Sequence, residues 1–161
     1  MSRVVLGTSL VADPAFAEAA IAQYGKLLCA GIDAKGGEVA VAGWREGAGV
    51  AAEELARDMA ALGFRYLVYT DIARDGMQTG IDPAAYVRMA EAFGHPVTAS
   101  GGVAGIVDIE ALGRVAGCIE GVIAGRAVYE GALAVADGVR ACDEATRIAE
   151  AAAVAANPCG L

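Results

Sequence analysis

The feature that most constrains the fold is an alternation of short apolar runs with longer stretches of helical period. The apolar runs, each closed by glycine or a small polar residue, cover residues 4–8, 27–33, 66–70, 96–100 and 121–125. The helical patterns cover about 13–24, 50–62, 82–93, 107–115 and 132–155, the last with an expected break near Gly138. Nearly continuous apolar strands joined by helices predict a parallel sheet that is buried on both faces.

The alternation predicts one α/β domain over residues 1–156, followed by a short tail at 157–161. Two parallel-sheet architectures fit it. A doubly wound sheet usually carries its glycine signature after the first strand. Here glycine and polar residues recur after every strand, which favours a βα barrel whose loops face one mouth. Five βα units form only an open arc, because the closed barrel needs eight, so a partial (β/α)8 barrel is predicted.

Charge and residue usage exclude several classes of function. Twelve Lys and Arg against 20 Asp and Glu give a formal charge of −8, which argues against a nucleic-acid or anionic-membrane surface. Arg3 and Asp13 interrupt any signal-peptide core, so a cytoplasmic protein is expected. The cysteines are scattered and His95 is the only histidine, so neither a disulfide framework nor a zinc site is predicted.

Glycine-rich turns after the last two predicted strands are candidates for binding phosphate. They comprise Ser100, Gly101 and Gly102, and then Gly125 and Arg126. Such loops at a barrel mouth hold phosphate through backbone N–H groups, although glycines in this position can also serve only to make tight turns. Gly7 and Thr8, after the first strand, also offer backbone N–H groups and a hydroxyl, but they are a weaker signal for a phosphate site. Two phosphate sites would imply a long, bisphosphorylated ligand.

Between these turns lie Asp33 and Thr70, at the ends of the second and third predicted strands. Side chains at the carboxyl end of a barrel strand point into the active site, where a carboxylate can act as a general acid or base. The alternative for Asp33 is a cap or a turn. Asp71 is expected to have a structural role, whereas Asp75 lies in a turn that can reach the ligand.

Trp44, the only tryptophan, follows the second strand on a loop that contains glycine. A tryptophan on such a loop can close over a flat heterocycle by stacking. The alternative is a tryptophan that packs against the rim of the barrel.

Together these motifs resemble the histidine-biosynthesis isomerase that converts ProFAR to PRFAR. The resemblance rests on residues 31–37 with Gly43 and Trp44, and on residues 69–76, 99–103 and 122–127. The sister family, the cyclase subunit of imidazole glycerol phosphate synthase, shares the fold and both phosphate sites. The Thr-Asp-Ile-Ala-Arg-Asp-Gly segment at 70–76 and the Gly-Trp pair favour the isomerase.

The resemblance implies an Amadori rearrangement of an aminoaldose to an aminoketose, without metal or organic cofactor. It assigns Asp33 as the acid that protonates the furanose ring oxygen, with Thr70 assisting. Gly102, Gly125 and Arg126 match one phosphate site, and Gly7 with Thr8 match part of the other. Trp44 matches the loop that folds over a bisphosphorylated ribonucleotide substrate.

In the resembled family the barrel has about 240 residues, and the first strand predicted here corresponds to its fourth. The first three strands and a partner aspartate therefore have no counterpart in this sequence. An open arc exposes two strand edges, which predicts a homodimer or a complementing N-terminal barrel fragment. The alternatives are a non-catalytic phosphate-binding half-barrel from a truncated gene, and the sister cyclase.

Overall fold

A computed structural model describes residues 2–156, and its centre is a sheet in which five strands run parallel. These strands are β1 Val4–Leu6, β2 Leu28–Lys35, β5 Leu67–Asp71, β6 Val97–Ser100 and β7 Ile119–Ile123. They lie in the order β1-β2-β5-β6-β7, which is the order of the chain. In a βα barrel the strands follow one another around the sheet in chain order, whereas in a doubly wound sheet the order reverses. The order found here is therefore that of a barrel. The predicted partial barrel is thereby confirmed, and its sheet is not closed.

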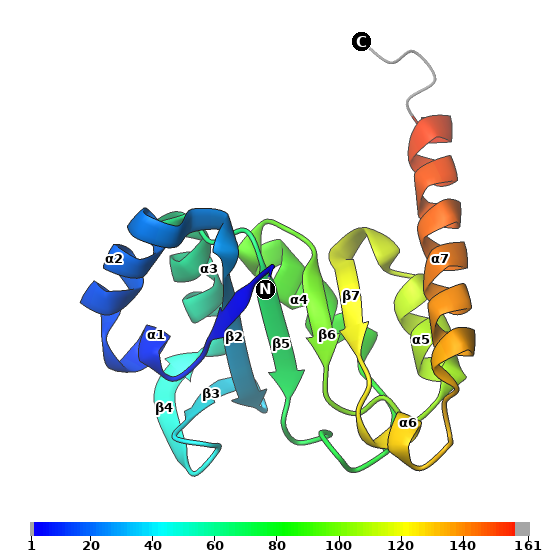
Figure 1. The fold of residues 1–161 in the computed structure, drawn as a ribbon, viewed down its shortest axis with the longest axis horizontal. Helices are drawn as coiled ribbons and strands as arrows, with labels where there is room; N and C mark the ends of the chain where they lie inside the picture. Colours follow the sequence, from blue (N-terminus) through cyan, green and yellow to red (C-terminus); the bar gives the residue numbers. More distant parts are fainter. Residues whose placement is uncertain (1, 157–161) are drawn as a thin grey trace.

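Helices cover one face of the sheet (Figure 1). The helices in the described residues are α1 Ser9–Ala12, α2 Pro14–Tyr24, α3 Ala52–Leu62, α4 Pro83–Phe93, α5 Ile106–Gly113, α6 Arg126–Tyr129 and α7 Val135–Ala156, with 3-10 turns at Gly25–Leu27 and Ala116–Cys118. Of these, α6 lies beyond the carboxyl end of β7 (Figure 1). Asp13 and Asp82 cap α2 and α4 by accepting from the amides of Phe16 at 3.0 Å and Ala84 at 3.1 Å, and proline follows each cap.

The core lies between the sheet and its helices. Alternate residues of the strands, such as Ile32 and Leu67, pack there against Phe64, Tyr86 and Phe93 from the helical layer. Burial of each such side chain stabilises the fold by about 1.5–3 kcal/mol. The residues between them in each strand point to the other, concave face. The concave face is therefore where the polar strand residues lie.

The first difference from prediction is a β-hairpin between β2 and α3. Its strands, β3 Glu38–Val41 and β4 Glu46–Ala51, pair antiparallel, and β3 also pairs with the end of β2. The helix predicted from residue 50 therefore begins at Ala52. In Figure 1 the hairpin lies at the carboxyl end of β2. The sequence obscures it because Gly47 and Gly49 dilute the alternation in β4.

Two further predictions were wrong in detail. The expected break near Gly138 is absent, because α7 continues through this glycine, which packs beside Leu133. One glycine costs a helix only about 1 kcal/mol relative to alanine, so a packed helix tolerates it. The last strand occupies 119–123 instead of 121–125, after an irregularity in its pairing with β6. The predicted tail and Cys159 lie outside the described residues.

An ion pair joins the two edges of the arc at the amino-terminal end of the strands. Arg3, just before β1, donates from Nη1 to Oε1 of Glu120 on β7 at 2.8 Å. Its guanidinium carbon also lies 3.4 Å from the ring centroid of Tyr66. One side chain can bridge β1 and β7 only if the sheet between them is strongly curved, as in a barrel wall.

Candidate active site

Three polar side chains form a row at the carboxyl ends of neighbouring strands. Asp33 pairs in register with Thr70, and Thr70 pairs with Ser100. Residues in register on parallel strands share a face, so the three side chains lie side by side on the concave surface. Thr70 and Ser100 are only 8% and 9% exposed. Asp33 and Thr70, predicted to act together, are thus on adjacent strands at the same level.

Trp44 contacts this row directly. Its indole Nε1 donates a hydrogen bond to Oδ2 of Asp33 at 2.7 Å. The turn of the β3–β4 hairpin makes this possible by placing Ala42, Gly43 and Trp44 in left-handed conformations, with φ of 54°, 66° and 68°. Two of these residues carry a Cβ, and each costs about 1–2 kcal/mol in that region. The sequence indicated a loop near the site, but not this bond.

The same hairpin turn reaches the loop after β1. The backbone amide of Ala42 donates to Oγ1 of Thr8 at 3.3 Å. Thr8, Asp33 and Trp44 then enclose a cavity of about 30 Å³ that also borders Gly7 and Gly43. Candidate residues from three separate segments of the sequence therefore meet at one place.

The glycine turn after β6 is packed too closely for any side chain. Gly101 and Gly102 have φ of +89° and +93°. A Cβ on Gly101 would lie 2.5 Å from the carbonyl oxygen of Asp71, and one on Gly102 would lie 2.8 Å from that of Gly80. The loop after β5 therefore rests directly on this turn. Both residues must be glycine for packing reasons, whether or not the turn also binds phosphate.

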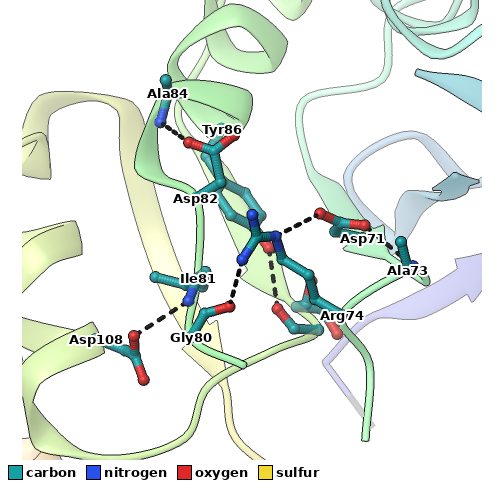
Figure 2. A network of polar contacts seen from close by, with 11 residues as sticks. Asp71, Ala73, Arg74, Gly80, Ile81, Asp82, Ala84, Tyr86 and Asp108 are labelled. Carbon is teal, nitrogen blue, oxygen red and sulfur yellow. Dashed lines mark hydrogen bonds and ion pairs between the residues drawn. The ribbon is translucent and has the colours of Figure 1, made fainter. Parts of the chain in front are cut away.

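Figure 2 shows the polar network that shapes the loop after β5. Asp71 accepts from the amide of Ala73 at 3.1 Å and lies 3.4 Å from Nε of Arg74. Arg74 donates in turn to the carbonyl of Gly80 at 3.1 Å, which closes the loop on itself. Asp71 thus forms an Asx turn, in line with the structural role expected for it. Asp75 lies within this loop, and its amide donates to the carbonyl of Asp71 at 3.0 Å.

Asp108 in α5 ties this loop to the glycine turn, and sequence reasoning missed it. Its carboxylate accepts from the amide of Ile81 at 3.1 Å (Figure 2). It also accepts from the amides of Ala104 at 2.8 Å and Gly105 at 3.2 Å. On the other side of the turn, the buried hydroxyl of Tyr86 donates to the carbonyl of Ser100 at 2.7 Å. The one sequence signal for the contacts of Asp108 was an acidic residue at the third position of the helix, three residues after Gly105. An acidic side chain at that position often accepts hydrogen bonds from the backbone amides that precede the helix.

Arg126, predicted to bind phosphate, is engaged by protein groups. Its guanidinium donates to Glu130 and to the carbonyl of Gly76. Gln78 donates to the other oxygen of Glu130 at 2.6 Å. The hydrogen bonds from Arg126 and Gln78 lower the pKa of the Glu130 carboxyl. The loop after β5 is thereby fastened to α6, next to Gly125.

The described residues contain no metal-binding cluster, disulfide or membrane-spanning helix. Within residues 2–156, no group of three or more His, Cys, Asp or Glu side chains is placed to hold a metal ion. Cys29, Cys118 and Cys142 are free thiols, and burial raises the pKa of Cys29 and of Cys142. His95 contacts Arg65, just before β6 begins. In the same part of the chain, no helix is long and apolar enough to cross a membrane.

A singly wound parallel sheet that gathers polar side chains and glycine turns at the carboxyl ends of its strands defines the βα-barrel class, in which active sites form at that end. Within this class the chain belongs to the family of histidine biosynthesis proteins, whose family model it matches over residues 1–134.

The chain is similar to several proteins named 1-(5-phosphoribosyl)-5-((5-phosphoribosylamino)methylideneamino) imidazole-4-carboxamide isomerase. The one from Psychrobacter cryohalolentis is 45% identical over 133 residues, which cover 83% of this chain and 54% of the relative. Those from Burkholderia mallei and Burkholderia pseudomallei are 46% identical over 145 residues, covering 89% of this chain and 58% of each relative. The chain therefore spans little more than half the length of these relatives.

Proposed function

We propose that this protein acts in histidine biosynthesis as the catalytic carboxyl-terminal part of a ProFAR isomerase. The observation that carries the proposal is the pairing of Asp33 with Thr70 at the carboxyl ends of adjacent strands, in a chain 45% identical to a protein named as such an isomerase. A cytoplasmic location accompanies this function.

In the proposed reaction Asp33 donates a proton to the furanose ring oxygen of the substrate. The bond between C1 and this oxygen breaks while the amine nitrogen forms a double bond to C1. A base supplied by the strands that complete the barrel takes the C2 proton, which gives an enaminol. Protonation at C1 and loss of the proton from the C2 hydroxyl then give the ketone. C2 is oxidised as C1 is reduced, so the step needs no external oxidant or reductant. Thr70, one strand away and nearly buried, is suited to holding Asp33 or the sugar hydroxyls in position.

Two phosphate sites complete the proposed ligand pocket. The turn of Ser100, Gly101 and Gly102, with Gly125 and Arg126, would bind one phosphate, and Gly7 with Thr8 the other. The name of the relatives contains two phosphoribosyl groups, which supports a bisphosphorylated ribonucleotide as the substrate. Trp44 would stack on its heterocycle, and the loop that contains Asp75 would border it.

Activity would require further strands that complete the barrel wall. Within the described residues, β1 pairs only with β2 and β7 only with β6, so each has a free edge. Beside β1 an apolar groove of about 460 Å³ is lined by Val4, Leu6, Phe16, Tyr24 and Leu27 among others. A complementing N-terminal barrel segment, or a second copy of the chain, would cover this groove and pair with the free edges.

The test is a coupled isomerase assay on ProFAR with the chain alone and with the amino-terminal segment of a similar isomerase added. Turnover is expected in the mixture. Asp33→Asn should lower it by about 10²–10⁴-fold, because a general acid contributes about that much. Asp58→Asn, which removes an exposed carboxylate from α3, serves as the matched control. Retained turnover in Asp33→Asn would exclude the acid role.

The other outcomes identify the alternatives. Binding of inorganic phosphate without turnover in any mixture would favour a non-catalytic half-barrel. Ammonia-dependent cleavage of PRFAR would favour the sister cyclase.

A further inference from the structure

The hairpin turn at residues 42–44 occupies two candidate ligand-binding groups at once. The indole of Trp44 donates to Asp33 at 2.7 Å, and the amide of Ala42 donates to Thr8 at 3.3 Å. The first group is the proposed acid, and the second is the hydroxyl proposed to bind phosphate. A short segment of the chain therefore makes contacts that a ligand with its own N–H or O–H donors would otherwise make.

The turn is anchored at its base by the pairing of Val41 with Glu46, and the two hydrogen bonds hold its tip against the site. Ala42 and Trp44 have φ of 54° and 68°, in the region that favours glycine. Residues remain in such conformations when surrounding contacts compensate for the strain. Trp44 is also 48% exposed, so packing covers only half of it. Loss of the two hydrogen bonds would let the turn relax away from the site.

We infer that Trp44 is a removable cap on Asp33. In the ligand-free protein the indole N–H holds the carboxylate oxygen, and a ligand reaches Asp33 only by displacing the 42–44 turn. A ligand replaces the indole at Oδ2 with its own hydroxyl or amine donor, which leaves the other carboxyl oxygen to carry the proton that Asp33 donates. This role differs from stacking, since it depends on the indole N–H and not on the ring face. It rests on the proposed catalytic role of Asp33.

The cap is tested by carboxylate labelling, which requires no turnover. The protein is treated with a water-soluble carbodiimide and glycine ethyl ester, and the rate at Asp33 is followed by mass spectrometry. Trp44→Phe keeps an aromatic ring but removes the N–H. We expect it to raise the Asp33 rate by about three- to ten-fold, because a hydrogen bond to a charged group favours the closed form by about that factor or more.

Tyr129→Phe is the matched control, because it removes a polar hydrogen from an aromatic side chain that is 91% exposed on α6. It should leave the Asp33 rate unchanged. Labelling of Glu110, exposed on α5, provides an internal reference in every sample. Equal Asp33 rates in the wild type and in Trp44→Phe would overturn the cap.

A second measurement keeps the proposal testable if Trp44→Phe folds poorly. Because Trp44 is the only tryptophan, its fluorescence reports on the turn alone. Asp33→Ala should increase quenching by acrylamide, whereas Glu110→Gln should not. Unchanged quenching in Asp33→Ala would also overturn the cap. Neither measurement depends on turnover, so failure of the isomerase proposal in the assay of Asp33→Asn would be distinguishable from failure of the cap.

Discussion

At the scale of single residues, Gly101 is the described glycine whose added Cβ would lie nearest a backbone atom. Its φ is +89°, and an added Cβ would lie 2.5 Å from the carbonyl oxygen of Asp71. We expect Gly101→Ala to lower the free energy of unfolding by about 2–4 kcal/mol, since left-handed strain adds to a backbone clash. Urea titration measures this. Gly117→Ala is the control, because its Cβ would meet nothing within 4 Å. Equal losses in the two variants would contradict the packing argument.

Tyr86 links stability to high pH. Burial raises the pKa of its hydroxyl well above the ordinary value of 10, while the unfolded chain ionises near 10. The folded state then keeps a proton that the unfolded state has lost, so stability present below pH 10 falls as the pH rises above 10. The slope is at most about 1.4 kcal/mol per pH unit for this group.

The measurement is urea unfolding between pH 8 and 11. Tyr86→Phe removes this part of the slope, although it also costs about 1–2 kcal/mol near neutral pH, because the carbonyl of Ser100 loses its donor. Tyr129→Phe, at an exposed site, should leave the slope unchanged. A slope that is the same in Tyr86→Phe and in the wild type would contradict the assignment.

The sequence indicated Asp33, Thr70 and the glycine turns, because each follows directly from a strand end. The bond between Trp44 and Asp33 could not be predicted, since it depends on a hairpin turn with left-handed alanine and tryptophan. Residues with a Cβ rarely adopt the left-handed region, so no sequence pattern predicts this turn. The contacts of Asp108 were hidden for a similar reason, because their three amides come from two loops.

At the scale of elements, Asp108 joins the loop after β5 to the start of α5. We expect Asp108→Ala to lower the free energy of unfolding by about 2–4 kcal/mol, because three partly buried amides lose their acceptor. The same variant should weaken binding of inorganic phosphate, if the glycine turn binds it. Glu110→Ala on the same helix is the control, with thermal unfolding as the readout. A loss no larger than that of the control would exclude this role.

The five predicted helices and five parallel strands were placed to within a few residues, because capping and apolar runs are local signals, whereas the four-residue helices α1 and α6 were not predicted. Asp13 and Asp82, each followed by proline, mark the starts of α2 and α4 as expected. The β3–β4 hairpin escaped because Gly47 and Gly49 dilute the alternation of β4. The break predicted at Gly138 is absent because the packing of the helix, with Leu133 beside this glycine, outweighs the low helix propensity of glycine.

At the scale of the whole molecule, the pair of Arg3 and Glu120 spans the concave face between the two edge strands. The number of βα units predicted an open arc, and this contact between its edges shows how strongly the arc is curved. We expect Arg3→Met to lower the Tm, and to lower it less in a Glu120→Gln background, where only the contact of the guanidinium with Tyr66 remains to be lost. Thermal unfolding of the wild type, the two single variants and the double variant completes this double-mutant cycle. Arg57→Met, which alters an exposed pair on α3, is the control. An equal effect of Arg3→Met in both backgrounds would show that the two residues are not coupled.

The free edge at β1 gives the last prediction. Four large apolar side chains around one groove are more than 40% exposed: Val4, Phe16, Tyr24 and Leu27. Such a density of exposed apolar side chains marks an interaction surface.

Leu27→Lys places a charge in this groove without touching the row of Asp33 and Thr70. We expect it to reduce self-association of the chain in sedimentation velocity, and to weaken restoration of turnover by an added amino-terminal segment by about ten-fold or more, because burying an unpaired charge is costly. Val107→Lys, at an exposed apolar residue of α5, should change neither. Equal behaviour of the two lysine variants would mean that the groove beside β1 is not where the barrel is completed.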